Sequence, residues 1–349
     1  MPAIVGPSSV LCAAGRGPEQ LWATIKSGIS CIKNSHVMDR NFDPIQMALV
    51  PDEELAPLPQ ELESSVLPSS AKRMLRLAGP TLSSIIQSAG TEPATLYLGL
   101  PQPRADEMPW LDEFLMHLEK IDGVRLNHDT SRTFALGRAA AMSALEAALA
   151  VIDEDSNSTL LVGGVDTFLD MRRITMLDAE GRILGPRVMD GFIPGEGAAF
   201  FALKGPNSRF FDEGATNARI LAATSVQDEA HRYSKAPGLG EGLANALEAL
   251  RERLPEGTPP VATTFAGFNG ENLEAKLWGV ARLRHSDLFA PDMVMQHPAD
   301  CFGDTGASMG AILMVLAAHA LSNGDRANSG LVWAASDLAT RGCALLSTQ

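Results

Sequence analysis

Thiols are the first side chains of this chain to consider as nucleophiles. The four cysteines are widely separated and show no C-x-x-C spacing: Cys12, Cys31, Cys301 and Cys343. This pattern excludes a disulfide scaffold and predicts reduced thiols in the cytoplasm. Cys301, which precedes a glycine-rich turn, and Cys12 remain candidate reactive thiols, but a small buried residue is the favoured interpretation of each.

Hydroxyl and imidazole groups offer a second possible chemistry. His128 and Asp129 lie close to Ser131 and Thr133, as in a hydroxyl nucleophile with its base. A polar turn is the favoured interpretation, because the order of nucleophile, base and orienting group cannot be established. Two further histidines are isolated and show no metal spacing: His231 and His297. The sequence therefore predicts no metal and no cofactor.

Arg138 stands at the start of the stretch around which the chain is organised. Residues 131–169 predict a sharp turn, an alanine-rich helix of about four turns, a polar loop and a buried strand, LLVGGVD. Helices of small residues pack closely against their neighbours. A helix N-terminus favours a negative group. An arginine there is electrostatically wrong for a thiolate or an anion site.

The remaining pattern predicts an α/β fold. Residues 19–27 and 71–89 have helical spacing, the second interrupted by Pro80, and residues 34–70 predict an irregular surface excursion. Strands are expected at 95–100 and after the turn-rich loop in 181–203. After residue 204 the pattern begins again, with strands at 218–225, 261–267, 292–298 and 330–336 and a helix at 238–254. We therefore expect two similar halves, residues 1–205 and 206–349.

Composition narrows the class of partner. The chain has 349 residues, 45% of them hydrophobic but only 5% aromatic, and its net charge is −14 without a basic cluster. Nucleic acid and anionic membranes are therefore poor partners. The apolar segment 306–321 is shorter than the roughly 20 residues of a membrane helix, which predicts a buried core helix. Without a signal segment, the expected location is the cytoplasm.

Four stretches together resemble the β-ketoacyl synthases of the thiolase superfamily, in family order. They are IVGPSSVLCAAGRGPEQLWATIKSGIS with Trp22 and Gly28, GGVDTF at 163–168, DGFIPGEGAA at 190–199 and FGDTGASMGAIL at 302–313. The resemblance implies a five-layered αβαβα body with two pseudo-symmetric halves, an active site between them, and usually a homodimer. Family members condense acyl thioesters with a cysteine at a helix N-terminus and two histidines, or a histidine and an asparagine.

The resemblance also implies that the catalytic positions are degenerate. GRAAAMSALEAA matches the family's nucleophile segment without a gap and puts Arg138 at the cysteine position, Asn269 falls at the first histidine position, and Asp304 at the second. The glycine-rich gate loop is reduced to ATRGC with Gly342. Arginine has no nucleophilic lone pair at neutral pH. No catalytic residues are therefore expected, and Arg138 and Asp304 are predicted to form a buried ion pair.

Other residues receive supporting roles or open interpretations. By analogy with the family, Glu196 would support loop packing through hydrogen bonds. A polar turn leading into a helix is either a packed structural feature or a distinct binding corner: Asn269, Gly270, Glu271 and Trp278.

Three function hypotheses follow. The first is a non-catalytic protein that acts as partner, adaptor or scaffold. Its FNGE-x-x-x-A-K-x-W-G turn resembles thiolase-like proteins of type VI secretion that help load effectors. The second is an enzyme, an acyl-transferring or condensing catalyst with altered residues, or a chain-length-factor-like subunit of a polyketide or fatty-acid synthase. The third is a sensor that binds a ligand in the residual pocket. A protein partner is expected, either a secretion effector or chaperone or an active synthase, in a homodimer or heterodimer.

Overall fold

Two sets of strands with the same order and the same pairing directions form the central sheet of the computed structural model, which describes residues 2–104, 108–209, 216–326 and 328–348. The first set is β1 (Ala3–Cys12), β5 (Leu96–Gly99), β6 (Arg132–Phe134), β7 (Thr159–Thr167) and β8 (Glu196–Lys204). The second set is β9 (Arg219–Gln227), β10 (Val261–Ala266), β11 (Phe289–Gln296), β12 (Ser329–Ala335) and β13 (Thr340–Ser347).

In each set, the first strand along the chain pairs antiparallel with the fifth, and the fifth pairs antiparallel with the fourth. The fourth strand pairs parallel with the second, which pairs parallel with the third. β1 and β9 join the two sets through a short antiparallel contact. The repeated topology supports an internal duplication. The boundary predicted after residue 205 falls in the connection between β8 and β9 and remains a proposal.

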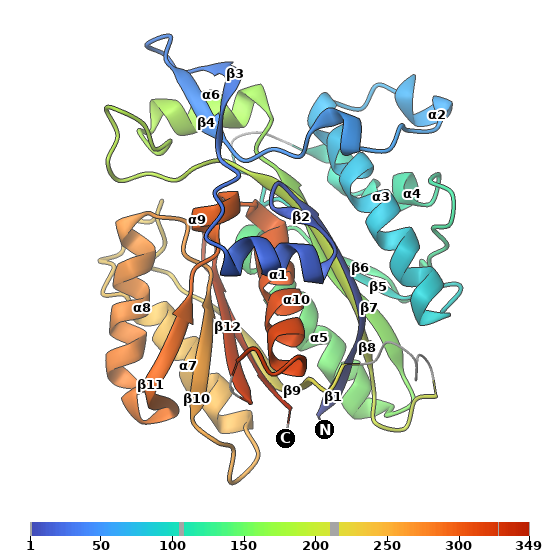
Figure 1. The fold of residues 1–349 in the computed structure, drawn as a ribbon, viewed down its shortest axis with the longest axis vertical. Coiled ribbons are helices and arrows are strands. Elements are labelled where there is room, and N and C mark those ends of the chain that lie inside the picture. The colour runs from blue at the N-terminus through green and yellow to red at the C-terminus, as the bar shows by residue number, and fades with distance from the viewer. Residues whose placement is uncertain (1, 105–107, 210–215, 327, 349) are drawn as a thin grey trace.

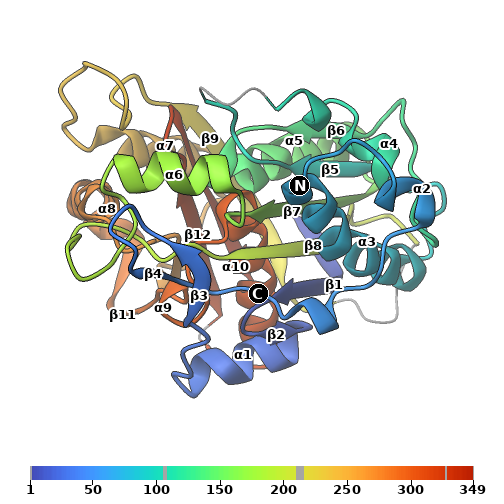
Figure 2. The same cartoon turned by 90° about the horizontal axis from the view of Figure 1, so that it is seen from above.

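The helices lie in layers around these two arms of the sheet (Figures 1 and 2). Between the arms lie α5 (Ala140–Glu154) and α10 (Met309–Ser322), which contact each other and strands of both sets. The outer face of the first arm carries α3 (Ser69–Ala89) and that of the second carries α7 (Glu241–Arg253), which packs on α8 (Asn272–Arg284). The order helix, sheet, helix, sheet, helix is the predicted five-layered α/β fold.

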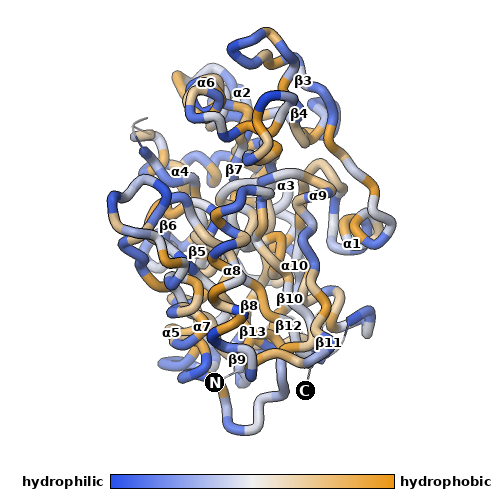
Figure 3. The backbone as a smooth tube through the Cα atoms, turned by 90° about the vertical axis from the view of Figure 1, so that its left-hand side faces the viewer, coloured by the Kyte–Doolittle hydropathy of each residue, from blue (hydrophilic) through white to orange (hydrophobic). Residues whose placement is uncertain are grey.

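Small and apolar residues explain why the middle layer is so tightly packed. α10 is buried on nearly every face, so the prediction of a core helix is confirmed, and no helix in the described parts of the chain is long and apolar enough to cross a membrane. Figure 3 shows hydrophobic segments gathered toward the middle of the molecule. β7 approaches the start of α10 so closely that a Cβ on Gly164 would lie 2.5 Å from the carbonyl oxygen of Ala307. Only glycine fits at such a contact.

The first half also contains several shorter elements. α1 (Pro18–Lys26) lies against α10, close to the predicted 19–27, and α6 (Met171–Ala179) follows β7. The segment 34–70 was expected to be irregular throughout. It instead contains β3 (Lys33–Met38) and β4 (Pro44–Met47), paired as a separate antiparallel sheet, and the short α2 (Gln60–Glu63). Alternation of exposed and buried side chains in β4 explains this pairing, which its prolines obscured in the sequence.

Two other predictions were wrong. α3 runs through Pro80 without interruption, because its buried face packs on the first arm of the sheet and this burial outweighs one missing backbone hydrogen bond. The hydroxyl of Thr81 donates to the carbonyl oxygen of Leu77, 2.7 Å away, within the same turn. The strand β13, which follows the predicted strand 330–336, was not predicted. Most of the ATRGC segment therefore belongs to a strand between β12 and β9 rather than to a gate loop.

Candidate functional site

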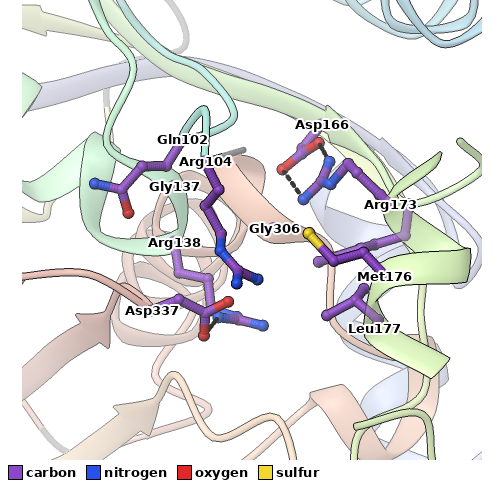
Figure 4. Close-up of a pocket in the computed structure, with 11 residues that line it drawn as sticks. Gln102, Arg104, Gly137, Arg138, Asp166, Arg173, Met176, Leu177, Gly306 and Asp337 are labelled. Carbon is purple, nitrogen blue, oxygen red and sulfur yellow. Dashed lines mark hydrogen bonds and ion pairs between the residues drawn. The ribbon is translucent and has the colours of Figure 1, made fainter. Parts of the chain in front are cut away.

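Arg138 lies in the tight turn Gly137–Ala139 that leads into α5, and its side chain is buried. Its Nε donates to Oδ2 of Asp304 at 2.6 Å, and Nη2 contacts the same oxygen. Nη1 donates to Oδ1 of Asp337 at 2.8 Å, the pair joined by a dashed line in Figure 4. The predicted ion pair between Arg138 and Asp304 is therefore confirmed, and Asp337 is a second partner that the sequence did not reveal.

Arg182 extends this ion pair into a network. Its guanidinium donates to both oxygens of Glu271, at 2.9 and 2.7 Å, and to both oxygens of Asp337, at 2.8 and 2.9 Å. The hydroxyl of Tyr233 accepts a further bond from Nη1 of Arg182 at 2.7 Å. Arg232 reaches the same Glu271 carboxylate at 2.9 Å. Buried charges persist in proteins when they are paired and hydrogen-bonded in this way.

Asn269 connects the polar turn before α8 to Asp304. Its Nδ2 donates to Oδ2 of Asp304 at 3.2 Å and to Oε2 of Glu271 at 2.9 Å, while its backbone N–H donates to Glu274 at 2.5 Å. The structure thus brings together all three positions that the family resemblance marked: Arg138, Asn269 and Asp304. Trp278, on the following helix, stacks on Trp333 with ring centroids 5.7 Å apart. These contacts fit a packed structural feature, the first of the two interpretations of this turn, and the second, a distinct binding corner, stays a prediction.

Burial and charge together set the protonation states of the network. Burial alone would raise the pKa of Asp337, but the guanidiniums of Arg138 and Arg182 hold it well below its usual range. Burial would lower the pKa of Arg138, but Asp304 and Asp337 raise it well above its ordinary value. Burial raises the pKa of Glu274 to about 8, and the charge of Arg138 opposes this rise only in part. At neutral pH Arg138 is therefore charged and Glu274 is predominantly protonated.

Three backbone donors near the starts of the two central helices are occupied by the chain's own side chains. The N–H of Gly306 donates to Oδ1 of Asp304 at 2.9 Å, and the N–H of Ala307 donates to Oδ2 of Asp166, also at 2.9 Å. Before α5, the N–H of Ala139 donates to Oγ of Ser336 at 3.0 Å. An oxyanion hole needs such donors to be directed at a substrate oxygen. Here they stabilise side chains instead.

The cavity beside Arg138 is small. Its volume is about 40 Å³, and it is lined in part by Gln102, Arg104, Asp166, Arg173 and Asp337 (Figure 4). A water molecule needs roughly 10–15 Å³ by this measure, whereas sites for drug-sized ligands occupy roughly 300–1,000 Å³. The cavity accommodates a few waters and no acyl chain. Arg173 forms an ion pair with Asp166 at 2.6 Å on its far wall.

The other candidate nucleophiles lie in settings that do not activate them. Nε2 of His128 contacts the carboxylate of Glu119, while Oγ of Ser131 accepts the backbone N–H of Leu96 at 3.0 Å. In the described structure, His128 and Ser131 have different partners and form no hydrogen bond with each other. The polar-turn interpretation therefore fits this stretch.

The surroundings of the thiols and of the remaining histidines do not activate them either. Burial raises the pKa of the Cys12 thiol to about 12 and that of Cys301 above its usual value, which disfavours the reactive thiolate. His231 accepts the backbone N–H of Tyr233 at 3.3 Å, and Nδ1 of His297 lies 2.7 Å from Oδ2 of Asp300. Among the described residues, no group of histidine, cysteine and carboxylate side chains has the arrangement of a metal site.

Glu196 supports loop packing, as the sequence predicted. Both its oxygens accept from Arg73, each at 2.6 Å, and they also accept from the hydroxyl of Thr167 and the N–H of Val50, each at 2.8 Å. The buried carboxylate thereby fastens the loop after β4 to α3 and to the end of β7.

Several network members were not found from the sequence. Arg182 lies in the loop before β8, Arg232 and Tyr233 in the loop after β9, and Asp337 in the turn between β12 and β13. Their spacing in the chain carries no signal, because strands of both sets bring them together only in the folded state. The SD pair before ATRGC, at the place where the family has its gate loop, was the available clue to Asp337.

No family model and no curated protein matches this chain by sequence. Its fold nevertheless matches solved ketosynthases. The ketosynthase from module 6 of the bacillaene synthase of Bacillus subtilis 168 superposes with a TM-score of 0.77 at 13% identity, covering 100% of this chain and 72% of that one. The ishigamide ketosynthase/chain length factor gives 0.72 at 14% identity, covering 100% and 99%. A ketosynthase in complex with its chain length factor from Xenorhabdus doucetiae gives 0.72 at 13%, covering 99% and 98%.

These likenesses define the class of fold. The chain has the thiolase-like ketosynthase fold over its whole described length. At 13–14% identity they carry no function to this chain.

Proposed function

We propose that this chain is a non-catalytic protein of ketosynthase fold that acts by binding a protein partner, as an adaptor or scaffold. One observation carries the proposal: the guanidinium of Arg138 occupies the start of the central helix and is paired with Asp304 and Asp337. A protonated arginine cannot attack a thioester. The cavity of about 40 Å³ beside it leaves no room for an acyl chain.

Two kinds of protein partner are candidates, and each implies a different cellular role. The resemblance of the turn at 268–279 to thiolase-like proteins of type VI secretion supports effector loading in the cytoplasm, with an effector or its chaperone as the partner. A second candidate is a chain-length-factor-like subunit that pairs with an active synthase. It is supported by the likeness to structures of ketosynthases that occur with a chain length factor or bind an acyl-carrier protein. In either setting we expect a homodimer or a heterodimer.

Intact-mass measurement tests the absence of acyl transfer. The full chain is incubated with acetyl-CoA and with malonyl-CoA, and its mass is compared with that of the untreated protein. We expect no adduct and no shift in melting temperature, since a ligand that binds the native state would raise it. A stable acyl adduct on Cys301, on Cys12 or on a serine would overturn the proposal. The variant Cys301→Ala distinguishes specific from incidental acylation.

Affinity purification of the tagged chain from its native host, after chemical cross-linking, tests the partner. Recovery of a secretion effector with its chaperone supports effector loading. Recovery of an active ketosynthase supports the subunit role. Recovery of the chain alone, as a homo-oligomer, contradicts a function through a different protein.

A further inference from the structure

Three of the four cysteines converge in the folded chain. Cys12, at the end of β1, and Cys301, in the short α9 (Ala299–Phe302), belong to the hydrophobic core around α10, and Cys31 packs against the same core from the segment after α1. Cys343 lies in a separate core beneath α7 and α8. All four are free thiols.

Cys31 and Cys301 are direct neighbours through the backbone. The N–H of Cys31 donates to the carbonyl oxygen of Cys301 at 2.8 Å. Standard bond lengths and this contact put the two Cα atoms about 5–6 Å apart. Disulfides span roughly 4.4–6.8 Å between Cα atoms. In the reduced protein the Sγ of Cys31 lies 4.0 Å from the carbonyl oxygen of Ile29.

We infer that Cys31 and Cys301 form a reversible disulfide that links the segment after α1 to α9. With glutathione disulfide as oxidant, the thiolate of Cys31 attacks one sulfur of the oxidant and releases one glutathione. The thiolate of Cys301 then attacks the sulfur of Cys31 and releases the second. Two protein thiols are oxidised to one disulfide, and one glutathione disulfide is reduced to two glutathione molecules.

The surroundings of the two thiols fix this order of attack. Cys31 is half-buried, whereas Cys301 is 7% exposed, so the oxidant reaches Cys31 first. Burial raises the pKa of both thiols, but the ammonium of Lys33 opposes this rise at Cys31. Cys31 is therefore the attacking thiol, and Cys301 resolves the mixed disulfide.

The link would act on the loop that carries Asp304. α9 ends at Phe302, and Asp304 follows after Gly303, held to the neighbouring loop because its N–H donates to Ile193 at 2.8 Å. A disulfide at Cys301 ties this loop to a distant part of the chain. It closes a very long loop, which stabilises a fold by restricting the unfolded chain. This inference does not depend on the proposed function.

Non-reducing peptide mapping tests the pair. The full chain, reduced and freed of reductant, is incubated with glutathione disulfide. We expect the mass to fall by two hydrogen atoms, a cross-linked peptide that joins Cys31 to Cys301, and a melting temperature several degrees higher. Cys31→Ser, at a half-buried site that tolerates the change, and Cys301→Ala should abolish all three, while Cys343→Ser should abolish none.

Three results would overturn the inference. One is a persistent adduct of a single glutathione on Cys31. Another is a cross-link that joins Cys12 instead. The third is an oxidised protein that melts at a lower temperature than the reduced one, because the link would then distort the native fold.

Discussion

Replacing Arg138 by alanine removes the cation at the centre of the buried network. Asp304, which is fully buried, loses its charged donor and keeps Asn269 and the N–H of Gly306, while Asp337 keeps other arginine partners. Breaking a buried ion pair by removing one partner costs about 3–5 kcal/mol, because an uncompensated charge remains. We expect Arg138→Ala to lower the free energy of unfolding by that amount.

Urea denaturation followed by circular dichroism measures this loss, and an exposed ion pair supplies the control. Arg251 and Asp287 are paired at 2.8 Å with about half of each side chain exposed, so Arg251→Ala should cost at most about 1 kcal/mol. The double variant Arg138→Met with Asp304→Asn removes both charges and should be more stable than Arg138→Ala. If Arg138→Ala costs no more than Arg251→Ala, the buried network contributes no more than an exposed ion pair and the reasoning fails.

Three further changes have defined outcomes. Because the pKa of Glu274 is raised by burial to about 8, the stability it contributes is lost as pH rises from about 4.5 through 8. Between pH 5 and 9 the free energy of unfolding should therefore change less with pH for Glu274→Gln than for the unchanged protein, by a few kcal/mol. Thermal melts at each pH measure this dependence. The depressed pKa of Asp337 contributes stability above about pH 4 that is lost at lower pH. Asp337→Asn should reduce this acid sensitivity and destabilise the protein at pH 7, and an unchanged melting temperature would contradict its place in the network. Gly164→Ala would put a Cβ 2.5 Å from the carbonyl oxygen of Ala307 and should cost roughly 1–3 kcal/mol by urea denaturation, whereas Gly279→Ala, on a helix with open space, should be neutral or stabilising.

Local patterns were sufficient to predict the scaffold. The alanine-rich helix after Arg138, the GGVD strand and the apolar helix after Gly303 were predicted because each has a strong pattern of its own. The strand β13 was missed because ATRGC was aligned with a loop, and only pairing with β12 and β9 makes it a strand. Helix α3 was wrongly predicted to be interrupted at Pro80, because helix propensity does not include the packing that outweighs the proline.

Some residues of the site were predicted from the sequence and others were not. Motif positions located Arg138, Asn269 and Asp304, and their contact follows from the packing of the two halves. Arg182 and Asp337 are ordinary polar residues in the sequence, and they come into contact only when loops from both halves meet. A sequence pattern predicts a residue's neighbours when they lie on one element, and it loses that power when the partners lie far apart in the chain.

The arginine at the start of the central helix ceases to be anomalous once its partners are known. A helix N-terminus favours an anion, and Asp304 supplies one, since it accepts the N–H of Gly306 at the start of the α10 segment. Arg138 pairs with that carboxylate and with Asp337, which Arg182 also contacts. The variant Arg138→Cys would leave its thiol beside two carboxylates, whose charge raises a thiol pKa rather than lowering it. A nucleophile at this position would therefore need changes at Asp304 and Asp337 as well as at Arg138.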